Sequence, residues 1–459
     1  MRTNSSNRHD CSGKSEIIIC LVLMIYLSFP SYSNASLVAF PGAEGYGARS
    51  VGGRGGKVIK VTNLNSSGPG SLQAACEAKG PRIVVFEVGG VIRGDIIIRH
   101  SFITIAGQTA PSPGITVAGR ILARQADHSL LHDIVIRFVR FRPPRTKGHT
   151  GDAAQLPKAD RVILDHLSLS WANDETVDIC NTSNITMQWC TLEESDTEGH
   201  DKGRHNFGLI SAYPESGNVS IHHNIFAHHS SRSPSLSPAV TNKSGDFRNN
   251  VIYNFYKGLT HDGHVPYGPI NLIANYYKKG PDSFIIIPFE FHGYGKYYVK
   301  DNYIDGVGVI GNLRDDYTDL PLWVRQSKKG KILRDPVKVA PVKTSTAIES
   351  FRIVTKQAGC FPRDRVTKRT IQEILEGTGK WGRNAPLNPT DEWFSEGLVI
   401  EKIPLDSDGD GIPDEWESKN GLNKSDASDY NRIMNSGYSA IEEYINDRAD
   451  MLIRKAMQE

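Results

Sequence analysis

Three aspartates followed by one arginine are the residues in the middle of this chain best suited to chemistry. Asp152, Asp174 and Asp178 lie close together in the sequence, and Arg232 follows a strand-like run as the first residue of an Arg-Ser-Pro stretch. Carboxylates at this density favour a hard cation such as Ca²⁺, because without one they would repel and raise one another's pKa. A cation beside a positioned arginine is what elimination on an acidic polysaccharide requires.

A second acidic run, DSDGDGIPDEWE, lies near the C-terminus at residues 406–417. Its acidic residues occupy positions one, three, five, nine and twelve of a calcium-binding loop: Asp406, Asp408, Asp410, Asp414 and Glu417. Gly411 stands at position six, where such a loop turns sharply. The spacing predicts a small EF-hand-like calcium module that stabilises the protein. The alternative is a solvated acidic linker.

Histidines and cysteines have simpler interpretations. His166, His222 and His223 stand beside expected strands without zinc-like spacing, which favours packed or hydrogen-bonded residues over metal ligands. Four cysteines follow the N-terminal apolar run: Cys76, Cys180, Cys190 and Cys360. An exported chain permits a disulfide between Cys180 and Cys190, and buried free thiols are the alternative.

Short β-rich runs recur between residues 103 and 304 and indicate a repeating fold. Asn224, Asn250, Asn275 and Asn302 fall 26, 25 and 27 residues apart within these runs. Such a period, with turn residues between the runs and no helical pattern, predicts an all-β solenoid of the parallel β-helix type. Stacked amides can hydrogen-bond one another at a tight bend, so we expect these asparagines to be structural.

The two ends of the chain differ from the middle. Basic residues, an apolar run at residues 17–29 and the small-residue stretch SYSNAS predict a signal peptide over residues 1–35 and a secreted protein. CEAKG at 76–80 predicts a short helix that caps the solenoid, and residues 367–382 contain a helix ended by Gly377. The expected domains are a β-helix over 36–384, a linker over 385–404 and a calcium-binding tail over 405–459.

Composition narrows the classes of partner. The 459 residues carry 53 basic and 51 acidic side chains, a formal net charge of +2. This balance argues against a bulk polyanion binder, so we expect no nucleic-acid partner, and no membrane contact once the signal is removed. We expect a monomer.

Several motifs together resemble the pectate lyases of polysaccharide lyase family 1. They cover most of residues 38–382 and include AFPGAEGYGA (39–48), NLNSSGPGSLQAA (63–75), FEVGGVI (86–92), ITIAGQTAP (103–111), IRFVRFRP (136–143), ILDHLSLSWANDE (163–175), SIHHNIFAHHSSRSP (220–234) and RNNVIYN (248–254). The resemblance implies a right-handed parallel β-helix and calcium-dependent β-elimination of α-1,4-linked polygalacturonate to unsaturated oligogalacturonides.

The resemblance also implies roles for single residues. Asp152, Asp174 and Asp178 match the family's calcium carboxylates, and Asp165 matches a more structural aspartate beside a histidine. Arg232 matches the catalytic arginine, with Pro234 as its conformational companion.

Three positions depart from the family pattern. Ser237 stands where a second substrate-binding arginine often occurs, and Thr150 stands where some members have a further acid. A basic residue normally lies between the calcium site and the catalytic arginine, and Lys202 and Arg204 are both candidates for substrate binding here.

Two alternatives to a lyase remain at the level of sequence. A β-helix polygalacturonase would hydrolyse the bond with paired carboxylic acids, but the chain lacks that family's adjacent Asp-Asp and Gly-His-Gly arrangements. A non-catalytic β-helix that binds glycans would leave the aspartates as turn residues. Calcium-dependent formation of an unsaturated product discriminates among the three.

Overall fold

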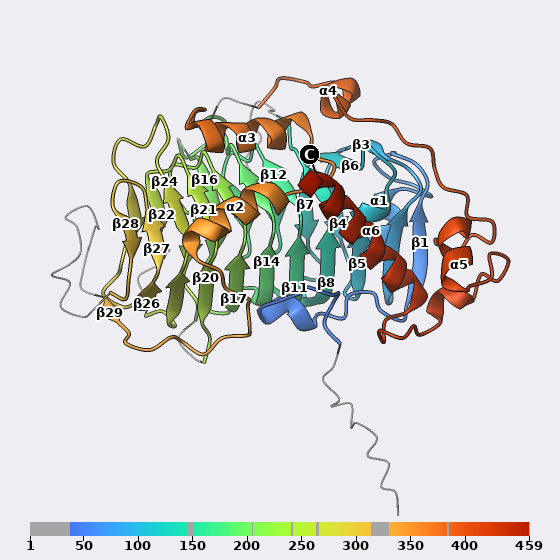
Figure 1. Ribbon diagram of the computed structural model, residues 1–459, viewed down its shortest axis with the longest axis horizontal. Coiled ribbons are helices and arrows are strands. Elements are labelled where there is room, and N and C mark those ends of the chain that lie inside the picture. The colour runs from blue at the N-terminus through green and yellow to red at the C-terminus, as the bar shows by residue number, and fades with distance from the viewer. Residues whose placement is uncertain are drawn as a thin grey trace, which may run out of the picture. The chain divides into compact units, whose positions relative to one another are not determined.

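Successive coils of the chain stack into parallel sheets, and each coil passes in turn through sheet 1, sheet 2 and sheet 3 (Figure 1). The computed structural model describes residues 37–144, 151–203, 205–239, 242–262, 266–313, 330–382 and 385–458. The predicted signal peptide, Thr150 and Arg204 lie outside these residues. The parallel β-solenoid predicted from the repeating runs is confirmed.

Sheet 1 is the longest sheet of the described residues, with eleven strands. In spatial order they are β1 (Lys57–Val61), β2 (Arg82–Phe86), β5 (Ile103–Ala106), β8 (Leu131–Arg137), β11 (Ala159–Asp165), β14 (Ser183–Gln188), β17 (Gly217–His222), β20 (Gly245–Arg248), β23 (Ile270–Ile273), β26 (Lys296–Lys300) and β29 (Lys331–Ile332).

Sheet 2 has ten strands among the described residues and is parallel except at its last pair, β27 and β28. Its strands are β3 (Gly90–Arg93), β6 (Ile115–Ala118), β9 (Val139–Phe141), β12 (Ser168–Ser170), β15 (Thr191–Glu193), β18 (Ile225–Ala227), β21 (Val251–Tyr253), β24 (Tyr276–Lys278), β27 (Asn302–Ile304) and β28 (Gly308–Ile310).

Sheet 3 is the shorter third side, and a two-stranded sheet 4 continues it through a bridge between Ser235 and Thr260. The strands of sheet 3 are β4 (Ile96–Ile98), β7 (Ile121–Ala123), β10 (Ala154–Gln155), β13 (Glu175–Asp178), β16 (Phe207–Ser211) and β19 (Ser235–Leu236). Sheet 4 consists of β22 (Lys257–Leu259) and β25 (Ile287–Phe289).

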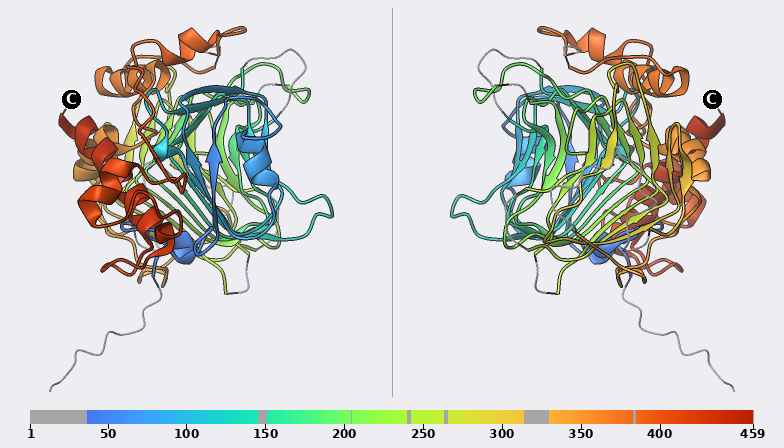
Figure 2. Two further views of the ribbon diagram at one scale, coloured as in Figure 1. Left: turned by 90° about the vertical axis from the view of Figure 1, so that its right-hand side faces the viewer. Right: turned by 90° about the vertical axis from the view of Figure 1, so that its left-hand side faces the viewer.

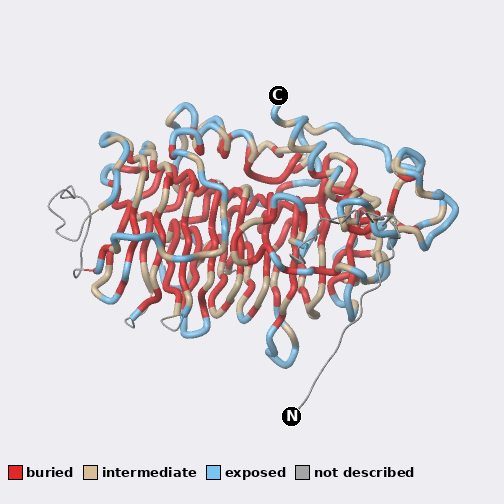
Figure 3. The backbone as a smooth tube through the Cα atoms, turned by 60° about the horizontal axis from the view of Figure 1, so that its bottom comes forward, coloured by how far each residue is buried: buried red, intermediate tan, exposed pale blue. Residues whose placement is uncertain are grey.

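Apolar side chains from all three sheets fill the interior of the coils. One continuous cluster runs from Val61 in the first coil to Ile332 in the last, and it is dominated by isoleucine, valine and leucine. Figure 3 shows the buried segments as parallel bands along the solenoid. Because side chains alternate between the two faces of a strand, the residues between these core positions face outward and are available for other tasks.

The four recurring asparagines form the predicted ladder at the bend between sheet 1 and sheet 2. All four are fully buried. The Oδ1 atom of Asn250 accepts hydrogen bonds from the backbone N–H and the Nδ2 of Asn224, at 3.0 and 3.1 Å. Asn275 receives the same pair of bonds from Asn250, and Asn302 receives it from Asn275. The ladder therefore satisfies backbone groups that the bend removes from the sheets.

A stack of aromatic rings stands at the same bend, one residue before the ladder. Phe138, His166, Trp189 and His223 all have positive φ angles. His166 stacks on Phe138 with ring centroids 4.6 Å apart, and Trp189 stacks on His223 at 4.4 Å. His166 also contacts the buried carboxylate of Asp165, at 3.0 Å. The structural interpretation of the histidines and of Asp165 is consistent with these contacts.

A short helix covers the apolar interior near the first coil. Helix α1 (Leu72–Glu77) begins after Ser71, whose side chain accepts a hydrogen bond from the backbone N–H of Ala74. Leu72, Ala75 and Cys76 belong to the interior cluster. The helix therefore begins before the predicted position at Cys76 and has ended by Lys79, because Ser71 supplies the N-cap.

The C-terminal helices lie along one side of the solenoid, as the views along the coils show (Figure 2). They are α2 (Ala347–Gln357), α3 (Arg365–Glu376), α4 (Asp391–Ser395), α5 (Asp414–Asn420) and α6 (Ala440–Gln458), and the 3₁₀ turns are η1 (Tyr46–Arg49), η2 (Gly107–Thr109) and η3 (Asp429–Asn431). Helix α3 ends at Gly377, which has a φ of 77°, as predicted.

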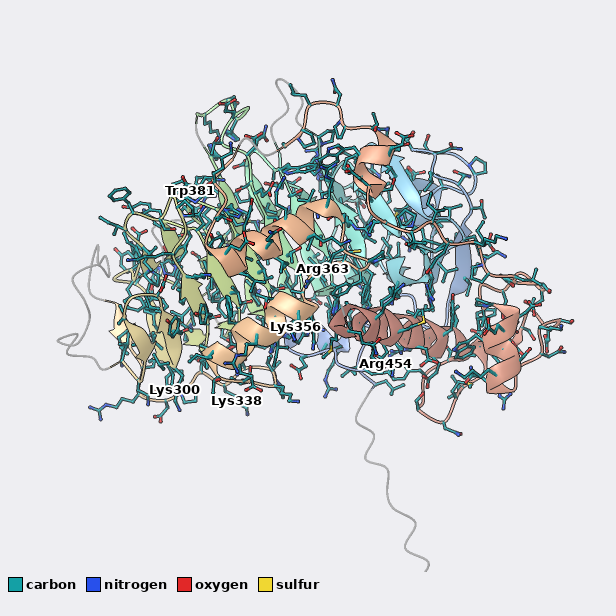
Figure 4. The ribbon with its side chains drawn as sticks, turned by 45° about the horizontal axis from the view of Figure 1, so that its top comes forward. Lys300, Lys338, Lys356, Arg363, Trp381 and Arg454 are labelled. Atoms are coloured by element: carbon teal, nitrogen blue, oxygen red, sulfur yellow. The ribbon has the colours of Figure 1, made fainter. Side chains whose placement is uncertain are left out.

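Apolar contacts and one buried ion network hold these helices to the sheets. Figure 4 shows α2, with Lys356, next to α6, with Arg454, and Gln357 donates to the sulfur of Met457 at 3.3 Å. Asp364, the N-cap of α3, accepts two hydrogen bonds from the guanidinium of Arg142, which also donates to Glu193 at 2.8 Å. All three of these charged side chains are buried, so loss of one partner would leave a buried charge uncompensated.

The cysteines follow the second of the two sequence interpretations. Cys76, Cys180, Cys190 and Cys360 are free and buried. No disulfide joins Cys180 and Cys190, because the two side chains are buried in different apolar clusters. Cys190 lies in the interior cluster, and Cys180 packs with Ile210 and Ala212. Among the described residues, no helix is both long and apolar enough to cross a membrane.

Replacing Asn250 with alanine should destabilise the solenoid by about 2–4 kcal/mol. The substitution leaves the backbone N–H of Asn224 and the carbonyl of Ile221 without their partners in a buried bend. Urea unfolding followed by circular dichroism measures the loss, with Asn65→Ala as an exposed control that should change stability by less than about 0.5 kcal/mol. Equal stability of the two variants would contradict the structural role of the ladder.

Candidate active site

The predicted catalytic arginine and two of the predicted metal ligands meet where the chain enters the strands of sheet 3. Asp152 lies two residues before β10, Asp174 lies directly before β13, and Arg232 lies shortly before β19. In the register of sheet 3, Ala154 pairs with Val177 and Glu175 pairs with Phe207. Parallel pairing thus places residues from separate motifs on neighbouring coils, about 4.8 Å apart.

Asp152 and Asp174 approach each other together with Glu175. One carboxylate oxygen from each residue lies within 4.8 Å of the others. Asp152 accepts hydrogen bonds from the backbone N–H of Glu175 at 3.0 Å and from Nε2 of Gln155 at 3.1 Å. Burial, followed by the charges of Asp178 and Asp174, raises the pKa of Asp152 well above its usual value. A donor set of carboxylate oxygens suits a hard cation such as Ca²⁺.

Asp178 lies beside this cluster rather than inside it. It stands opposite Gln155 in the register of β10 and β13, and Nε2 of Gln155 lies 3.4 Å from one of its carboxylate oxygens. The other oxygen accepts the backbone N–H of Cys180 at 2.8 Å. Gln155 therefore bridges Asp152 and Asp178. Glu175 was missed from the sequence, and one of its oxygens lies within 4.8 Å of oxygens of both Asp152 and Asp174.

Arg232 reaches across one coil toward these acids. Its guanidinium lies over the ring of Phe207, 4.4 Å from the ring centroid, and one Nη contacts the carboxylate of Glu175. Burial lowers the pKa of Arg232, against the opposing effect of Asp262, Asp174 and Asp152. The positive φ of Arg232 is shared by many bends of this solenoid, so it does not by itself mark a functional residue.

Two histidines adjoin the acidic cluster and were missed from the sequence. His200 and His205 stack with ring centroids 3.6 Å apart, and their Nε2 atoms lie 3.3 and 3.6 Å from the carboxylate oxygens of Asp174. Lys202 lies in the exposed turn between them, and its backbone N–H donates to His200. Arg204, the other predicted substrate-binding residue, lies outside the described residues.

A cleft of about 420 Å³ opens beside Arg232. Its lining includes Phe207, Arg232, Tyr256, Lys257 and His261. Lys257 forms an ion pair with Glu290 at 3.0 Å. Nδ1 of His261 donates to the carbonyl of Leu236, so its Nε2 accepts a hydrogen bond from the hydroxyl of Tyr297 at 2.8 Å. Nothing in the sequence indicated that Lys257 and His261 lie beside Arg232, because their position depends on the register between sheet 3 and sheet 4.

Ser237 is held by hydrogen bonds to the backbone of the next coil. It is buried, and its hydroxyl donates to the backbone carbonyl of Asp262 and accepts from the backbone N–H of the same residue, both at 3.2 Å. A serine in this position brings no cation to the groove. The next coil supplies a positive charge instead, because Lys257 lines the cleft together with Arg232.

The C-terminal loop also brings acidic residues together, but Asp429 takes part in place of the predicted Asp414. Asp406, Asp408 and Asp410 have carboxylate oxygens within 4.8 Å of one another, and Asp410 also meets Glu417 and Asp429 at this range. Asp414 lies outside both groups: its carboxylate accepts the backbone N–H and the hydroxyl of Ser407, each at 2.7 Å. Asp429 was missed because it lies beyond the loop motif.

The relatives found by comparison with known proteins are pectate lyases. No protein-family model matches the chain. The chain is similar to the probable pectate lyase C of Aspergillus fumigatus, with 35% identity over 439 residues that cover 92% of this chain and 97% of the relative. The probable pectate lyase C of Aspergillus terreus is 36% identical over 426 residues, covering 90% and 95%. A solved pectate lyase bound to a hexasaccharide is 12% identical, with a TM-score of 0.46 over 72% of this chain and 99% of that one.

Replacing Asp152 with asparagine should stabilise the metal-free protein at neutral pH by about 1–3 kcal/mol. An acid whose folded pKa is raised favours folding fully below its unfolded pKa, and this contribution is lost as pH rises from the unfolded pKa through the folded pKa. A neutral amide does not carry this cost at neutral pH. The same variant should show a smaller rise in melting temperature when calcium is added, because a ligand is lost.

Melting curves in EDTA and in calcium test both expectations. Asp127→Asn, at an exposed turn outside the cluster, is the matched control and should behave like the wild type. An Asp152→Asn protein with wild-type stability in EDTA and a wild-type calcium response would show that Asp152 neither carries this cost nor contributes to a cation site.

Proposed function

Because this chain belongs to the pectate lyase family and is a polysaccharide lyase, we propose that it cleaves α-1,4-linked polygalacturonate by β-elimination and releases unsaturated oligogalacturonides. The observation that carries the proposal is the arginine held on Phe207 between an acidic cluster and an open cleft. Family membership argues against the hydrolase and the non-catalytic alternatives.

The proposed reaction requires three changes at one galacturonosyl unit. The proton on C5 is removed, the C4–O bond breaks, and a double bond forms between C4 and C5. The departing oxygen takes a proton from water. The C5 proton is weakly acidic because its removal adds negative charge next to the carboxylate, so the site must stabilise that charge.

Arg232 is the residue we assign to the proton on C5. An isolated guanidinium stays protonated at neutral pH, but burial lowers the pKa of Arg232 and so eases loss of its proton. Stacking on Phe207 restricts its orientation toward the cleft. In the alternative role, Arg232 stabilises the developing charge and hydroxide takes the proton.

Asp152, Asp174 and Asp178 are the proposed calcium ligands, and Glu175 stands beside them as the partner of Arg232. Calcium, when bound, would neutralise the substrate carboxylate. The carboxylates themselves hold the guanidinium in place and repel a substrate that arrives without a cation. Without a cation the arrangement is unfavourable for Asp152, because its burial and the charges of Asp178 and Asp174 disfavour the ionised form.

Cations near the cleft are the proposed substrate-binding groups. Lys202 and Arg204 come from the segment between the acidic cluster and Arg232. Lys257 lines the cleft itself and is held by Glu290. We propose that Lys257 compensates for the absence of an arginine at Ser237, because a sugar carboxylate in the cleft can compete with Glu290 for the ammonium group.

Other expectations from the sequence belong to the same proposal. We propose a secreted monomer that loses residues 1–35, winds as a right-handed coil and acts on an acidic polysaccharide without a nucleic-acid or membrane partner. We also propose that the domain boundaries at 384 and 404 separate the solenoid from a calcium-binding tail. The loop motif predicted Asp406, Asp408, Asp410, Asp414 and Glu417 as ligands of this tail, and Asp414 lies apart from the other four.

Removal of calcium should abolish most of the cleavage of polygalacturonate. The assay follows the new ultraviolet absorbance of the unsaturated product in enzyme treated with EDTA and in the same enzyme after calcium is restored. Activity should return on addition of calcium, because the carboxylates at the site need a cation between themselves and an acidic substrate. Equal rates with and without chelator would contradict the metal assignment, and reducing ends without ultraviolet absorbance would indicate hydrolysis.

Replacing Arg232 with lysine should lower turnover by about 10³-fold, which corresponds to roughly 4 kcal/mol of transition-state stabilisation. Lysine keeps the positive charge but changes the reach, the fork geometry and the basicity of the side chain. Arg334→Lys, at an exposed position, is the matched control and should keep normal turnover. The melting temperature of both variants should remain close to that of the wild type.

The pH profile tests whether a strong base takes part in the reaction, whichever of the two roles Arg232 has. Activity of the wild type should rise through the alkaline range, because a high-pKa group or hydroxide must supply the base. Near-normal turnover of Arg232→Lys at all pH values would remove Arg232 from the reaction.

A further inference from the structure

Buried carboxylate oxygens without partners converge in the C-terminal tail. Within the described residues, Asp408 Oδ2, Asp410 Oδ2, Asp429 Oδ1 and both carboxylate oxygens of Glu417 are buried and accept no hydrogen bond. Glu417 is 0% exposed and Asp410 is 5% exposed. Leaving ionised oxygens buried without a partner costs free energy, whereas a cation would satisfy all of them together.

Backbone donors orient the remaining oxygens of the loop. Asp406 accepts the N–H groups of Gly409 and Gly411, at 2.8 and 3.0 Å. Asp408 and Asp410 each use one oxygen for a backbone N–H two residues further on, which leaves the other oxygen facing the cluster. The loop is therefore already shaped around a common point.

Asp429 completes the cluster from outside the loop. Its Oδ2 accepts the N–H of Asn423 at 2.8 Å, which fixes the carboxylate, and its Oδ1 remains without a partner beside Asp410 and Glu417. Asp414, which the loop motif would use at position nine, instead binds Ser407 and is excluded. A cation held here would tie the loop to η3 as well as to α5.

The same loop is packed against the first coils of the solenoid. Ile412, fully buried, lies in a cluster with Ile83 and Val85 of β2 and with Ile441 of α6. A Cβ added to Gly411, whose φ is 96°, would lie 2.7 Å from a methyl of Val58 in β1, so only glycine allows this approach.

Charged contacts join the same two parts. Lys60 of β1 forms ion pairs with Asp406 at 3.1 Å and with Glu87 at 2.7 Å, and Arg54 pairs with Glu442 of α6 at 2.7 Å. Strand β1 is the outermost strand of sheet 1, and α5 lies next to it (Figure 1). The tail therefore covers the outer face of sheet 1 at its first two strands.

We propose that a divalent cation of the calcium type binds between Asp406, Asp408, Asp410, Glu417 and Asp429, with Asp414 outside its ligand set, and that it fastens the tail over the first coils. The inference does not rest on the lyase activity. In a solenoid each coil is stabilised chiefly by its neighbours, so holding the first coils closed protects the coils that follow.

Calorimetric titration of the full-length, chelated protein with calcium tests the ligand set. Asp429→Asn and Glu417→Gln should each lose one binding site or at least tenfold in its affinity, while Asp414→Asn should stay within about twofold of the wild type. Equal calcium binding by wild type, Asp429→Asn and Glu417→Gln would overturn the proposal. Loss of the site in Asp414→Asn but not in Asp429→Asn would overturn the proposed ligands.

Hydrogen exchange resolved by mass spectrometry tests the fastening of the tail. Calcium should slow exchange by at least tenfold in peptides from β1, β2 and α6 of the wild type and of Asp414→Asn, but not of Asp429→Asn. A cation that binds without slowing exchange in β1 would overturn its role in holding the tail. Because Asp429→Asn keeps every residue of the candidate active site, its cleavage of polygalacturonate at saturating calcium and low temperature should match the wild type, and an inactive wild type with an intact tail site would count against the lyase proposal alone.

Discussion

Parallel hydrogen bonding between neighbouring coils is the interaction on which the site depends. It holds equivalent positions of successive coils about 4.8 Å apart, whatever their separation in the sequence. Glu175 pairs with Phe207, and Phe207 forms a bridge with Ser231, so Arg232 comes within reach of an acid two coils away. A shift of one residue in this register would turn either partner to the opposite face.

The bends must be as well defined as the strands, since each one sets the start of the next sheet. The asparagine ladder and the aromatic stack supply this order on one side of the solenoid. The bend into sheet 3 is built differently, from charged and polar residues such as Asp152, Glu175 and Arg232. The stability of the bend with the asparagine ladder offsets the cost of placing charged groups close together at the bend into sheet 3.

Buried acids recur in two places for related reasons. Around Asp152 the carboxylates meet Arg232, which contacts Glu175 and lines the neighbouring cleft. In the tail, Glu417 is fully buried and faces other carboxylates from the same short segment. A cation in the first arrangement would be accessible to a second ligand, whereas a cation in the second would be enclosed.

The sequence by itself determined the repeating coil, the structural role of the asparagines, the stop of α3 at Gly377 and the family to which the chain belongs. These features depend on local patterns: a regular spacing, a turn residue or a contiguous motif. Only the tertiary structure decided that Glu175 is the partner of Arg232 and also approaches Asp152 and Asp174. It likewise decided that Lys257 lines the cleft and that Asp429 joins the acids of the tail. Coils of unequal length bring these residues together, and their register is set by packing between coils rather than by any spacing visible along the chain.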